Sequence, residues 1–428
     1  MKLKIIHIIT RLDKGGSSEN VLISCKYFAL KKEPVKYDYE IVLIYGGKTK
    51  SLDFNISTLN FKTYYIEELQ RKISFIKDLV AFLRILNIIK KEKPDIVHTH
   101  TSKGGILGRW AAFLLRTFSL EFRNIKIIHT PHGHIFYGYY NKLITFMFLV
   151  IEKITAKITD KIVALTDGEK NESLMYGIGK INQWVVIPSG VDYNLQITYH
   201  ELNNLKEEFN IKENMIIGTV ARLEPVKGVR YLIEAIPFIC NFLNSSFSFL
   251  IVGDGSERKK LEKLLTEQHF KVVSLSKSFY YGQKNNIKIF EKTLKDKKIK
   301  VIFTGMRENV VELISIMDIY VQPSLNEGMG KTIVLAQLLG KPVIATKVQG
   351  ISSVVVDLHT GILVEPQDSK KLAEAVVRLL MDVKLRTEMS SNAKVWVNKI
   401  IDGYPQFSIE RMIFLLESLY TNIFSTKK

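Results

Sequence analysis

Two stretches of the 428-residue chain share one layout, and this repetition constrains the fold more than any other feature. The first, IIHIITRLDKGG, begins at Ile5, and the second, MIIGTVARLEPVKG, begins at Met215. Each is an apolar, β-branched run followed by Arg-Leu, an acidic residue and a glycine that opens a helical pattern. We therefore predict two similar α/β domains, each of which begins with a buried strand.

Strand and helix signals alternate through both halves of the chain. Strand-like runs cover residues 4–10, 39–45, 96–98, 126–129, 161–165 and 184–187 in the first half, and residues 247–252, 301–303, 319–321 and 342–345 in the second. Apolar residues at helical spacing lie between them, and one such stripe consists of Ile73, Ile76, Val80, Leu83 and Leu86. Strands joined by helices form parallel, doubly wound sheets, which bind ligands where the strands end.

The polar residues 193–214 separate the two patterns and are the best linker candidate. We predict an N-terminal domain at residues 1–195 and a C-terminal domain at residues 196–404, with a last helix in residues 405–428 that packs back on the first domain. Seven lysines lie between Lys284 and Lys300, so residues 268–300 are expected to form a basic surface insertion. Solvation explains such a charge run, and contact with lipid or a partner is the alternative.

The net charge of +18 allows an anionic partner, which can be a phosphate-bearing substrate, an acidic membrane surface or nucleic acid. No zinc-finger spacing, aromatic RNA-binding motif or basic zipper is present, so we expect no nucleic-acid partner. The two cysteines, Cys25 and Cys240, lie far apart and match no metal-ligand spacing, which fits a reducing cytoplasm.

Two apolar segments bear on membrane contact. The N-terminus is interrupted by Arg11 and Asp13, so it predicts a buried strand and not a signal peptide. The longest apolar run, residues 143–151, is too short to span a bilayer and predicts a core or interfacial helix. We expect a cytoplasmic protein, with peripheral binding to the inner face of a membrane as a further property.

A loop in the second half is suited to an anionic ligand. The segment VQPSLNEGMGKTIVLA contains a strand end, the carboxylate Glu327, two glycines (Gly328 and Gly330) and the start of a helix. A helix N-terminus offers backbone N–H groups and a positive dipole end to a diphosphate. Arg222 and Lys227 follow another strand of this half and could converge on the same ligand. The alternative is a glycine-rich turn that caps a buried helix, with both cations on the surface.

Histidines gather after two strands of the first half. His98 and His100 end one strand, and His129, His132 and His134 surround the end of the next. Such spacing can provide metal ligands, but no carboxylate lies near either group and no Asp-x-Asp motif exists. We therefore predict no metal site here, and a polar pocket wall with one catalytic or sugar-binding histidine instead.

In this order and spacing, the motifs resemble those of the retaining family-4 glycosyltransferases of the GT-B fold. RLDKGGSSEN, VHTHTSKGGILGR, HTPHGHIFYGYY and VIPSGVD look like the family's loops in the acceptor domain and at the domain crossover. GTVARLEPVKG, IVGDG and PSLNEGMGK look like its donor loops. The resemblance is closest to the bacterial branch that assembles surface polysaccharides and lipid-linked glycans.

The resemblance implies two Rossmann-like domains that face each other across a cleft. It implies a nucleotide-sugar donor, most often a UDP-sugar, in the second domain and a glycan or lipid-linked acceptor in the first. Transfer would retain the anomeric configuration and would need no metal or other cofactor.

The resemblance also implies roles for individual residues. Catalytic roles fall to His132, Glu327, Arg222 and Lys227. Donor contacts fall to Gly15, Gly16, Arg222, Lys227, Gly253, Met306, Arg307, Glu327, Gly328, Met329, Gly330, Lys331, Thr332 and the position of Leu335. Acceptor contacts fall to His100, Lys103, His134 and Tyr137.

One position departs from the family pattern. A second carboxylate usually follows the first by eight positions and holds the ribose, but here that position is Leu335. Leucine accepts no hydrogen bond, and the loss of one is worth roughly 1–3 kcal/mol. A weak or inactive sugar-nucleotide-binding subunit is therefore an alternative to an active transferase. A nucleotide-sugar epimerase is another alternative, but it would need a different set of catalytic carboxylates and histidines.

Overall fold

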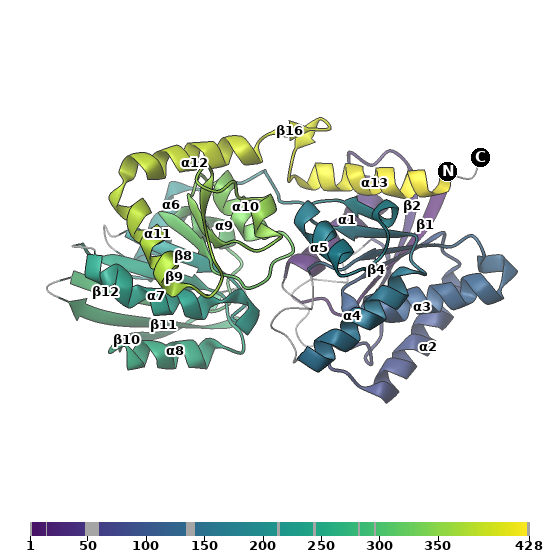
Figure 1. The fold of residues 1–428 in the computed structure, drawn as a ribbon, viewed down its shortest axis with the longest axis horizontal. Helices are drawn as coiled ribbons and strands as arrows, with labels where there is room; N and C mark the ends of the chain where they lie inside the picture. Colours follow the sequence, from purple (N-terminus) through teal and green to yellow (C-terminus); the bar gives the residue numbers. More distant parts are fainter. Residues whose placement is uncertain are drawn as a thin grey trace. The chain divides into compact units, whose positions relative to one another are not determined.

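The computed structural model describes residues 2–13, 15–47, 60–133, 142–211, 215–242, 245–280, 283–294 and 297–425, and it divides them into two compact units (Figure 1). The first unit contains the described residues up to Val191 and those from Ile401 onward. The second contains the described residues of Asp192–Ile400.

The first unit is built on a seven-stranded parallel sheet. Its strands are β1 (Lys2–Ile9), β2 (Asp38–Tyr45), β3 (Lys62–Tyr65), β4 (Ile96–His100), β5 (Lys126–Thr130), β6 (Lys161–Ala164) and β7 (Trp184–Val186), in the order β3-β2-β1-β4-β5-β6-β7. The connecting helices are α1 (Gly16–Ala29), α2 (Phe75–Glu92), α3 (Ser102–Phe118), α4 (Lys142–Ala156) and α5 (Asp167–Met175). Strand β1 lies inside the sheet, between β2 and β4, and its residues 5–9 are all buried, as expected for a strand covered on both faces.

The second unit is built on an eight-stranded sheet. Its strands are β8 (Met215–Val220), β9 (Phe247–Val252), β10 (Lys271–Tyr280), β11 (Gln283–Leu294), β12 (Lys297–Phe303), β13 (Ile319–Gln322), β14 (Val343–Thr346) and β15 (Gly361–Val364), in the order β10-β11-β12-β9-β8-β13-β14-β15. Its helices are α6 (Tyr199–Glu208), α7 (Val229–Phe242), α8 (Arg258–Glu267), α9 (Val310–Ser315), α10 (Lys331–Leu338), α11 (Ser369–Met381) and α12 (Val383–Val397). Here β8 lies at the point where the strand order reverses, as β1 does in the first sheet. The two units confirm the predicted pair of doubly wound α/β domains.

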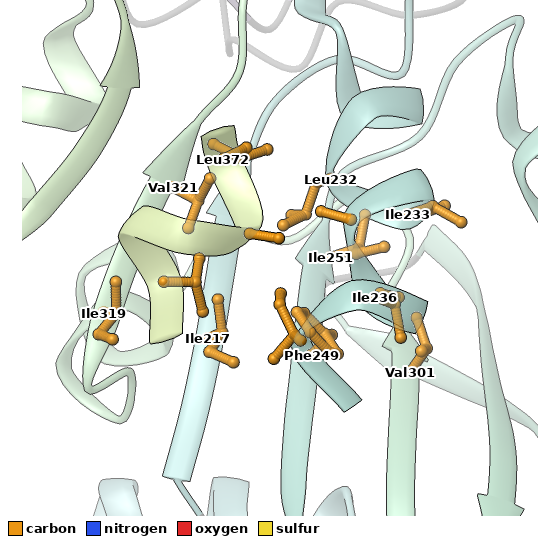
Figure 2. Close-up of a cluster of buried hydrophobic side chains, with 14 of the residues drawn as sticks. Ile217, Leu232, Ile233, Ile236, Phe249, Ile251, Val301, Ile319, Val321 and Leu372 are labelled. Carbon is orange, nitrogen blue, oxygen red and sulfur yellow. The ribbon is translucent and has the colours of Figure 1, made fainter. Parts of the chain in front are cut away.

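The core of the second unit shows why these strands are apolar throughout. In Figure 2, Leu232, Ile233 and Ile236 of α7 lie over Phe249 and Ile251 of β9. All five side chains are fully buried. Burial of one such side chain contributes roughly 1.5–3 kcal/mol, so this layer is a main source of the unit's stability.

The last helix, α13 (Ile409–Ser425), belongs to the first unit, where it packs beside α1 (yellow in Figure 1). The hydroxyl group of Tyr420 lies 2.8 Å from Nδ1 of the buried His98 in β4. The buried carboxylate of Glu417 accepts hydrogen bonds from the backbone N–H groups of Lys36 and Tyr37. Helix α13 therefore covers the sheet of the first unit and satisfies polar groups within it.

The apolar stripe predicted for the helix at 73–86 is not the buried face of α2. The helix begins after Ile73, and Ile76 and Leu83 are 75% and 50% exposed. The buried face carries Ala81 and Ile85, with Ile89 one turn further on. Apolar residues occur on both sides of this helix, so helical spacing alone could not identify the side that packs.

Two further segments differ from the sequence prediction. The supposed linker contains α6, which starts at the capping residue Thr198 and packs through the buried Leu205. The supposed surface insertion forms β10 and β11, two antiparallel strands that extend the sheet beyond β12. Several of its lysines are paired: Lys288 forms an ion pair with Glu262, and Lys292 donates to the carbonyl of Gln268. The alternation of apolar and polar residues that is typical of strands was not recognised in the sequence, because lysines occupy many positions of this hairpin.

Candidate functional site

The strand order of the second unit reverses between β8 and β13. The chain leaves β8 toward β9 and β12, and it returns to β13 on the other side of β8. Because β8 and β13 are parallel neighbours, the loops that follow them leave the same edge of the sheet. We call the edge where parallel strands end the carboxyl edge, and ligands of such sheets bind at this reversal point. The loop after β8 carries Arg222 and Lys227, and the loop after β13 carries Glu327.

These two loops are locked together through their backbones. The N–H group of Leu325 donates to the carbonyl oxygen of Val226 at 2.8 Å. Gly228 has a φ of +61°, and a Cβ atom there would lie 1.9 Å from the carbonyl oxygen of Pro323. Only glycine permits both this conformation and this approach. Gly228 was not predicted as a site residue, although its place after Lys227 in the repeated motif was a usable signal.

Lys227 and Glu327 meet between the two loops. Oε1 of Glu327 accepts hydrogen bonds from Nζ of Lys227 at 2.7 Å, from Oγ of Ser324 at 2.9 Å and from Nε2 of Gln322 at 3.0 Å. Gln322 in turn accepts a hydrogen bond from the buried Tyr320 hydroxyl. Among the described residues, no hydrogen bond to Oε2 of Glu327 is found. The carboxylate is thus fixed through one oxygen, and its side chain remains 11% exposed.

Sequence reasoning missed Gln322 and Ser324. Their spacing at the end of β13 was the available signal, because residues two apart on an extended chain point to the same side. Each presents its polar group to the same carboxylate oxygen. The two residues therefore orient Glu327, which the sequence had shown only as a lone acid.

Helix α10 begins directly after the Glu327 loop. Gly330 is its N-terminal capping residue and adopts a left-handed conformation with a φ of +84°. Met329 is buried, whereas Lys331, Thr332 and Leu335 are partly exposed. The start of α10 supplies the positive dipole end that an anion favours.

The other predicted donor residues that follow strands of this sheet are Gly253, Arg222 and Met306. Gly253, at the end of β9, has a φ of +126°, and a Cβ atom there would lie 2.0 Å from the carbonyl oxygen of Ala221. It therefore serves the packing of the Arg222 loop. Arg222 and Met306 are both partly exposed, and Met306 follows β12.

The structure corrects the assignment of Arg307 as a donor-binding side chain. Its guanidinium is buried and forms two hydrogen bonds of 2.7 and 2.9 Å to the carboxylate of Glu208 in α6. It also stacks over the ring of Phe209. This buried, bidentate ion pair anchors α6, and the guanidinium is occupied by Glu208 in the interior of the unit.

The first sheet has its own reversal point, between β1 and β4, and the histidines lie there. Nδ1 of His7 is 3.0 Å from Nε2 of His100, and Nδ1 of His100 is 3.0 Å from Nε2 of His132. His98 contacts Tyr420 through Nδ1 and the hydroxyl of Thr130 through Nε2. Sequence reasoning did not single out His7, although it lies in the repeated motif.

Burial lowers the pKa of these histidines. The pKa of His7 falls to about 3, and those of His98 and His100 fall well below their ordinary value for the same reason. Neutral imidazoles are good metal ligands, and ligand atoms of His7, His98 and His100 lie within 4.8 Å of one another. Their ring nitrogens, however, are hydrogen-bonded to one another and to Thr130, Tyr420 and His132, except for Nε2 of His7. In this structure the three histidines are joined in a network of hydrogen bonds.

His132 lies in a turn that a buried acid holds in place. His132 itself has a φ of +58°, a conformation that is unusual for a residue with a side chain. The next N–H group, that of Gly133, donates to Oε1 of Glu169 at 2.8 Å. Oε2 of Glu169 accepts from the N–H group of Leu165. Burial raises the pKa of Glu169 from 4.5 to about 7. No sequence signal distinguished Glu169 from an ordinary first-turn acid of a helix.

Of the four predicted acceptor residues, the structure describes two, His100 and Lys103. His100 is 4% exposed, with both ring nitrogens facing other histidines, so it supports His132 and presents no nitrogen to an acceptor. Nζ of Lys103 contacts Asp78 and the carbonyl oxygen of Lys72. His134 and Tyr137 lie outside the described residues.

Gly15 and Gly16 stand at the start of α1. Gly15 is its N-terminal capping residue, and Gly16 is its exposed first residue. Among the described residues, a Cβ atom at Gly15 would meet nothing closer than 4.0 Å, so none of their contacts requires glycine there.

The sequence matches two family models and many known proteins. Residues 31–195 match the family described as Glycosyltransferase Family 4, and residues 202–275 and 280–396 match the family described as Glycosyl transferases group 1. The chain is 31% identical over its whole length, and over 98% of the relative, to the Escherichia coli UDP-Gal:alpha-D-GlcNAc-diphosphoundecaprenol alpha-1,3-galactosyltransferase. It is 25% identical, over 97% of this chain and 96% of the relative, to the Staphylococcus aureus capsular polysaccharide biosynthesis glycosyltransferase CapM.

A solved structure shows the same fold. Alr3699/HepE from Anabaena, solved in complex with UDP-glucose, superposes with a TM-score of 0.74 over 98% of this chain and all of that chain, at 18% identity. None of the described helices combines the length and the apolarity that crossing a membrane requires.

Proposed function

Because this chain belongs to the family-4 glycosyltransferases of the GT-B fold, we propose that it transfers a sugar from a UDP-sugar to a lipid-linked glycan, with retention of anomeric configuration and without a metal ion. A UDP-sugar donor and an undecaprenol-linked acceptor both occur in the name of the E. coli relative. UDP-glucose is the ligand of the Anabaena structure. The retaining stereochemistry is carried over from the family resemblance.

The proposal rests mainly on the hydrogen bonds that the carboxylate of Glu327 forms. Three donors hold its Oε1 and leave Oε2 for a hydroxyl group of the donor sugar. Lys227 lies next to it, and the backbone at the start of α10 follows within a few residues. A diphosphate beside these groups would have its charge compensated by Lys227, by Arg222 and by the α10 dipole as it leaves the sugar. These cations supply the role that a metal ion plays in other transferases.

The first unit would bind the acceptor near His132. The turn of His132 lies at the carboxyl edge of the first sheet, where ligands of doubly wound sheets bind. Glu169 fixes the backbone of this turn, and His100 contacts the imidazole. We therefore assign His132 to the reacting sugar, and we assign His7, His100 and Glu169 to its support.

A lipid-linked acceptor requires access to a membrane, and the first unit has an apolar surface in a suitable place. In a parallel sheet, every connecting helix begins at the carboxyl edge, so α2 and α4 both begin there. At these helix starts Phe75 is 85% exposed and Phe146 is 62% exposed. We call the exposed apolar side chains at these two helix starts the apolar edge; they are Ile73, Phe75, Ile76, Leu79, Leu143, Phe146 and Met147.

The charges around the apolar edge favour an anionic membrane as its occupant. Lys72, Lys77 and Lys142 are exposed beside it. The acid Asp78 is engaged by Lys103 at 2.7 Å. Apolar side chains flanked by lysines match a bilayer with acidic headgroups, where each adjacent lysine contributes about 1 kcal/mol.

A transfer assay with defined donors tests the proposal. The full chain is incubated with UDP-galactose, UDP-glucose, UDP-N-acetylglucosamine or GDP-mannose and a polyprenyl-diphosphate-linked sugar in detergent. We expect transfer from a UDP-sugar with an α-linkage in the product, read by NMR, and no loss of activity in EDTA. Transfer with inversion, transfer from GDP-mannose alone or dependence on a metal would overturn the corresponding part of the proposal. Tight UDP-sugar binding without transfer to any acceptor would favour the inactive binding subunit.

A further inference from the structure

A row of buried polar side chains leads along strand β13 to Glu327. In this strand, Ile319 and Val321 point into the apolar cluster of the second unit (Figure 2). Successive side chains of a strand point to opposite faces, so Tyr320 and Gln322 lie on the other face. Both are buried, and the hydroxyl group of Tyr320 donates to Oε1 of Gln322 at 2.7 Å. Apolar packing alone does not require such a pair, so we looked for its role at Glu327.

The proton of Tyr320 sets the direction of this hydrogen bond. Burial raises the pKa of its hydroxyl group well above the ordinary value, although a hydrogen bond with Thr332 acts in the opposite direction. The hydroxyl group therefore keeps its proton at neutral pH. Two acceptors lie near it, Oε1 of Gln322 at 2.7 Å and the carbonyl oxygen of Val220 at 3.4 Å. Because the shorter contact is the stronger hydrogen bond, the proton goes to Gln322.

Tyr320 thereby fixes which end of the Gln322 amide faces Glu327. The oxygen and nitrogen of an amide side chain exchange places in a half-turn, and the hydrogen-bond partners decide between the two orientations. A hydroxyl donor on one side requires the oxygen there, so the nitrogen points toward Glu327. Both of its N–H groups are then used, because Nε2 donates to Oγ of Ser324 at 2.8 Å and to Oε1 of Glu327 at 3.0 Å.

Ser324 transmits the same direction. Its hydroxyl group accepts from Gln322 and gives its own proton to Oε1 of Glu327, 2.9 Å away. With Nζ of Lys227 at 2.7 Å, this oxygen has three donors. No hydrogen bond to the other oxygen, Oε2, is found among the described residues. The hydrogen bonds that start at Tyr320 thus determine which oxygen of Glu327 is held and which is open to a ligand.

We propose that Tyr320 is a positioning residue for the donor sugar, because it acts through Gln322 to hold Glu327 with Oε2 turned toward a hydroxyl group of that sugar. The inference rests on the proposed function, which places the donor sugar at Glu327. It adds a residue that touches neither sugar nor diphosphate and that acts on one half of the donor only. Loss of the Tyr320 hydroxyl group should therefore weaken recognition of the sugar and leave recognition of the nucleotide unchanged.

Calorimetry with and without the sugar tests this selectivity. Tyr320→Phe removes only the hydroxyl group, and the binding of UDP, UDP-glucose and UDP-galactose to the full chain is measured in variant and parent. The UDP-sugar that the parent prefers should bind about three- to tenfold more weakly to the variant, the effect of one hydrogen bond. Binding of UDP should change less than about twofold. Equal weakening of UDP and the UDP-sugar, or no change in either, would overturn the proposal.

A double variant shows whether Tyr320 acts through the carboxylate. Glu327→Gln already loses the sugar contact, so adding Tyr320→Phe to it should not weaken UDP-sugar binding further. Additive losses would mean that Tyr320 acts by another route, and the assignment would be wrong. Gln322→Met keeps the length of the side chain but removes both ends of the amide, and it also serves if Tyr320→Phe does not fold. It should give the same selective loss, and a loss of UDP binding would count against the proposal.

Tyr64→Phe is the matched control for the removal of a hydrogen-bonded hydroxyl group. The hydroxyl group of Tyr64 donates to the buried carboxylate of Glu92 in the first unit. This variant should bind UDP and UDP-sugars as the parent does, and urea unfolding compares the stabilities of both Tyr→Phe variants. If the control shows the same selective loss of sugar binding, the effect does not come from the contact with Gln322 and the inference fails.

The two readouts separate this inference from the proposed function. If Tyr320→Phe selectively weakens UDP-sugar binding but no sugar is transferred to any acceptor, the proposed transfer fails and the positioning role stands. If a UDP-sugar is transferred but Tyr320→Phe weakens UDP and UDP-sugar binding equally, this inference fails and the proposed function stands.

Discussion

Lys227 and Glu327 are 100 residues apart in the chain, and their side chains form an ion pair of 2.7 Å at the carboxyl edge of the second sheet. Their strands, β8 and β13, are parallel neighbours, which brings the two following loops together. The ion pair leaves the second carboxylate oxygen of Glu327 without a partner among the described residues. A cation and a hydrogen-bond acceptor therefore lie side by side, an arrangement that suits the diphosphate and a hydroxyl group of a sugar diphosphate.

Glu327→Gln should abolish most of the transfer activity. The amide keeps the shape of the side chain but replaces one carboxylate oxygen by NH₂, which accepts no hydrogen bond from a sugar hydroxyl. We expect kcat/KM to fall at least a hundredfold, which corresponds to about 2.7 kcal/mol. Glu262→Gln is a matched control, because Glu262 is also partly buried and paired with two cations but lies on α8. Full activity in Glu327→Gln would contradict the assignment.

Gly228→Ala should disrupt the contact between the two donor loops. A methyl group would lie 1.9 Å from the carbonyl oxygen of Pro323, at a φ of +61°. Gly403→Ala is the control: its φ is +84°, but no atom of the residues that the structure describes lies within 4 Å of its Cβ position. The control should lose about 1 kcal/mol of stability from the backbone conformation alone. Gly228→Ala should lose about 3 kcal/mol and weaken UDP binding, measured by urea unfolding and calorimetry. Equal losses in both variants would show that the close contact is unimportant.

Leu335→Glu should tighten UDP binding about tenfold if the missing second carboxylate is a lost ribose contact. Leu335 is partly exposed on α10, so a longer polar side chain fits there. Leu338→Glu on the same helix serves as the control and should not tighten binding. Isothermal calorimetry with UDP measures the change. Unchanged binding in Leu335→Glu would indicate that another residue of this chain holds the ribose.

The stability of the first unit should depend on the protonation of Glu169. Its pKa is raised from 4.5 to about 7 by burial, so the native state keeps the proton to higher pH than the unfolded chain. The stabilisation is present below pH 4.5 and is lost as the pH rises toward 7, by about 3 kcal/mol. Urea unfolding, followed by Trp110 and Trp184 in a Trp396→Phe background, measures this loss.

Two variants identify the group responsible for that pH dependence. Glu169→Gln cannot titrate, so its stability should change less with pH between 4.5 and 7 than that of the parent protein. Asp167→Asn on the same helix is exposed and should keep the parent dependence. If Glu169→Gln shows the same slope as the parent, another group is titrating.

Removal of the apolar edge should weaken membrane binding. The triple variant Phe75→Ser, Ile76→Ser, Phe146→Ser should bind vesicles of phosphatidylglycerol at least tenfold more weakly in sedimentation, because each buried apolar side chain contributes roughly 1.5–3 kcal/mol. Binding of the parent protein should fall in high salt and on phosphatidylcholine.

The chain offers a control for that experiment at the opposite edge of the sheet. Phe118 ends α3 and Leu120 follows it, and both are more than 80% exposed. Phe118→Ser with Leu120→Ser should leave vesicle binding unchanged. An equal loss in both sets would indicate general hydrophobic adsorption and not docking through the apolar edge.

The sequence by itself determined the architecture. The layout repeated at Ile5 and Met215 predicts two strands that open two domains, and β1 and β8 are indeed interior strands of two separate sheets. These features depend on residues close in sequence, so periodicity and composition reveal them.

Only the tertiary structure decided what individual side chains do. Arg307 looked like a ligand residue until its contact with Glu208 placed it in the core. The support of Glu327 by Gln322 and Ser324, and that of His132 by His100 and His7, depend on which strands are neighbours. Periodicity also left open which side of α2 is buried. A pattern along the chain records how often apolar residues recur, but the partner of a side chain is set by packing between distant segments.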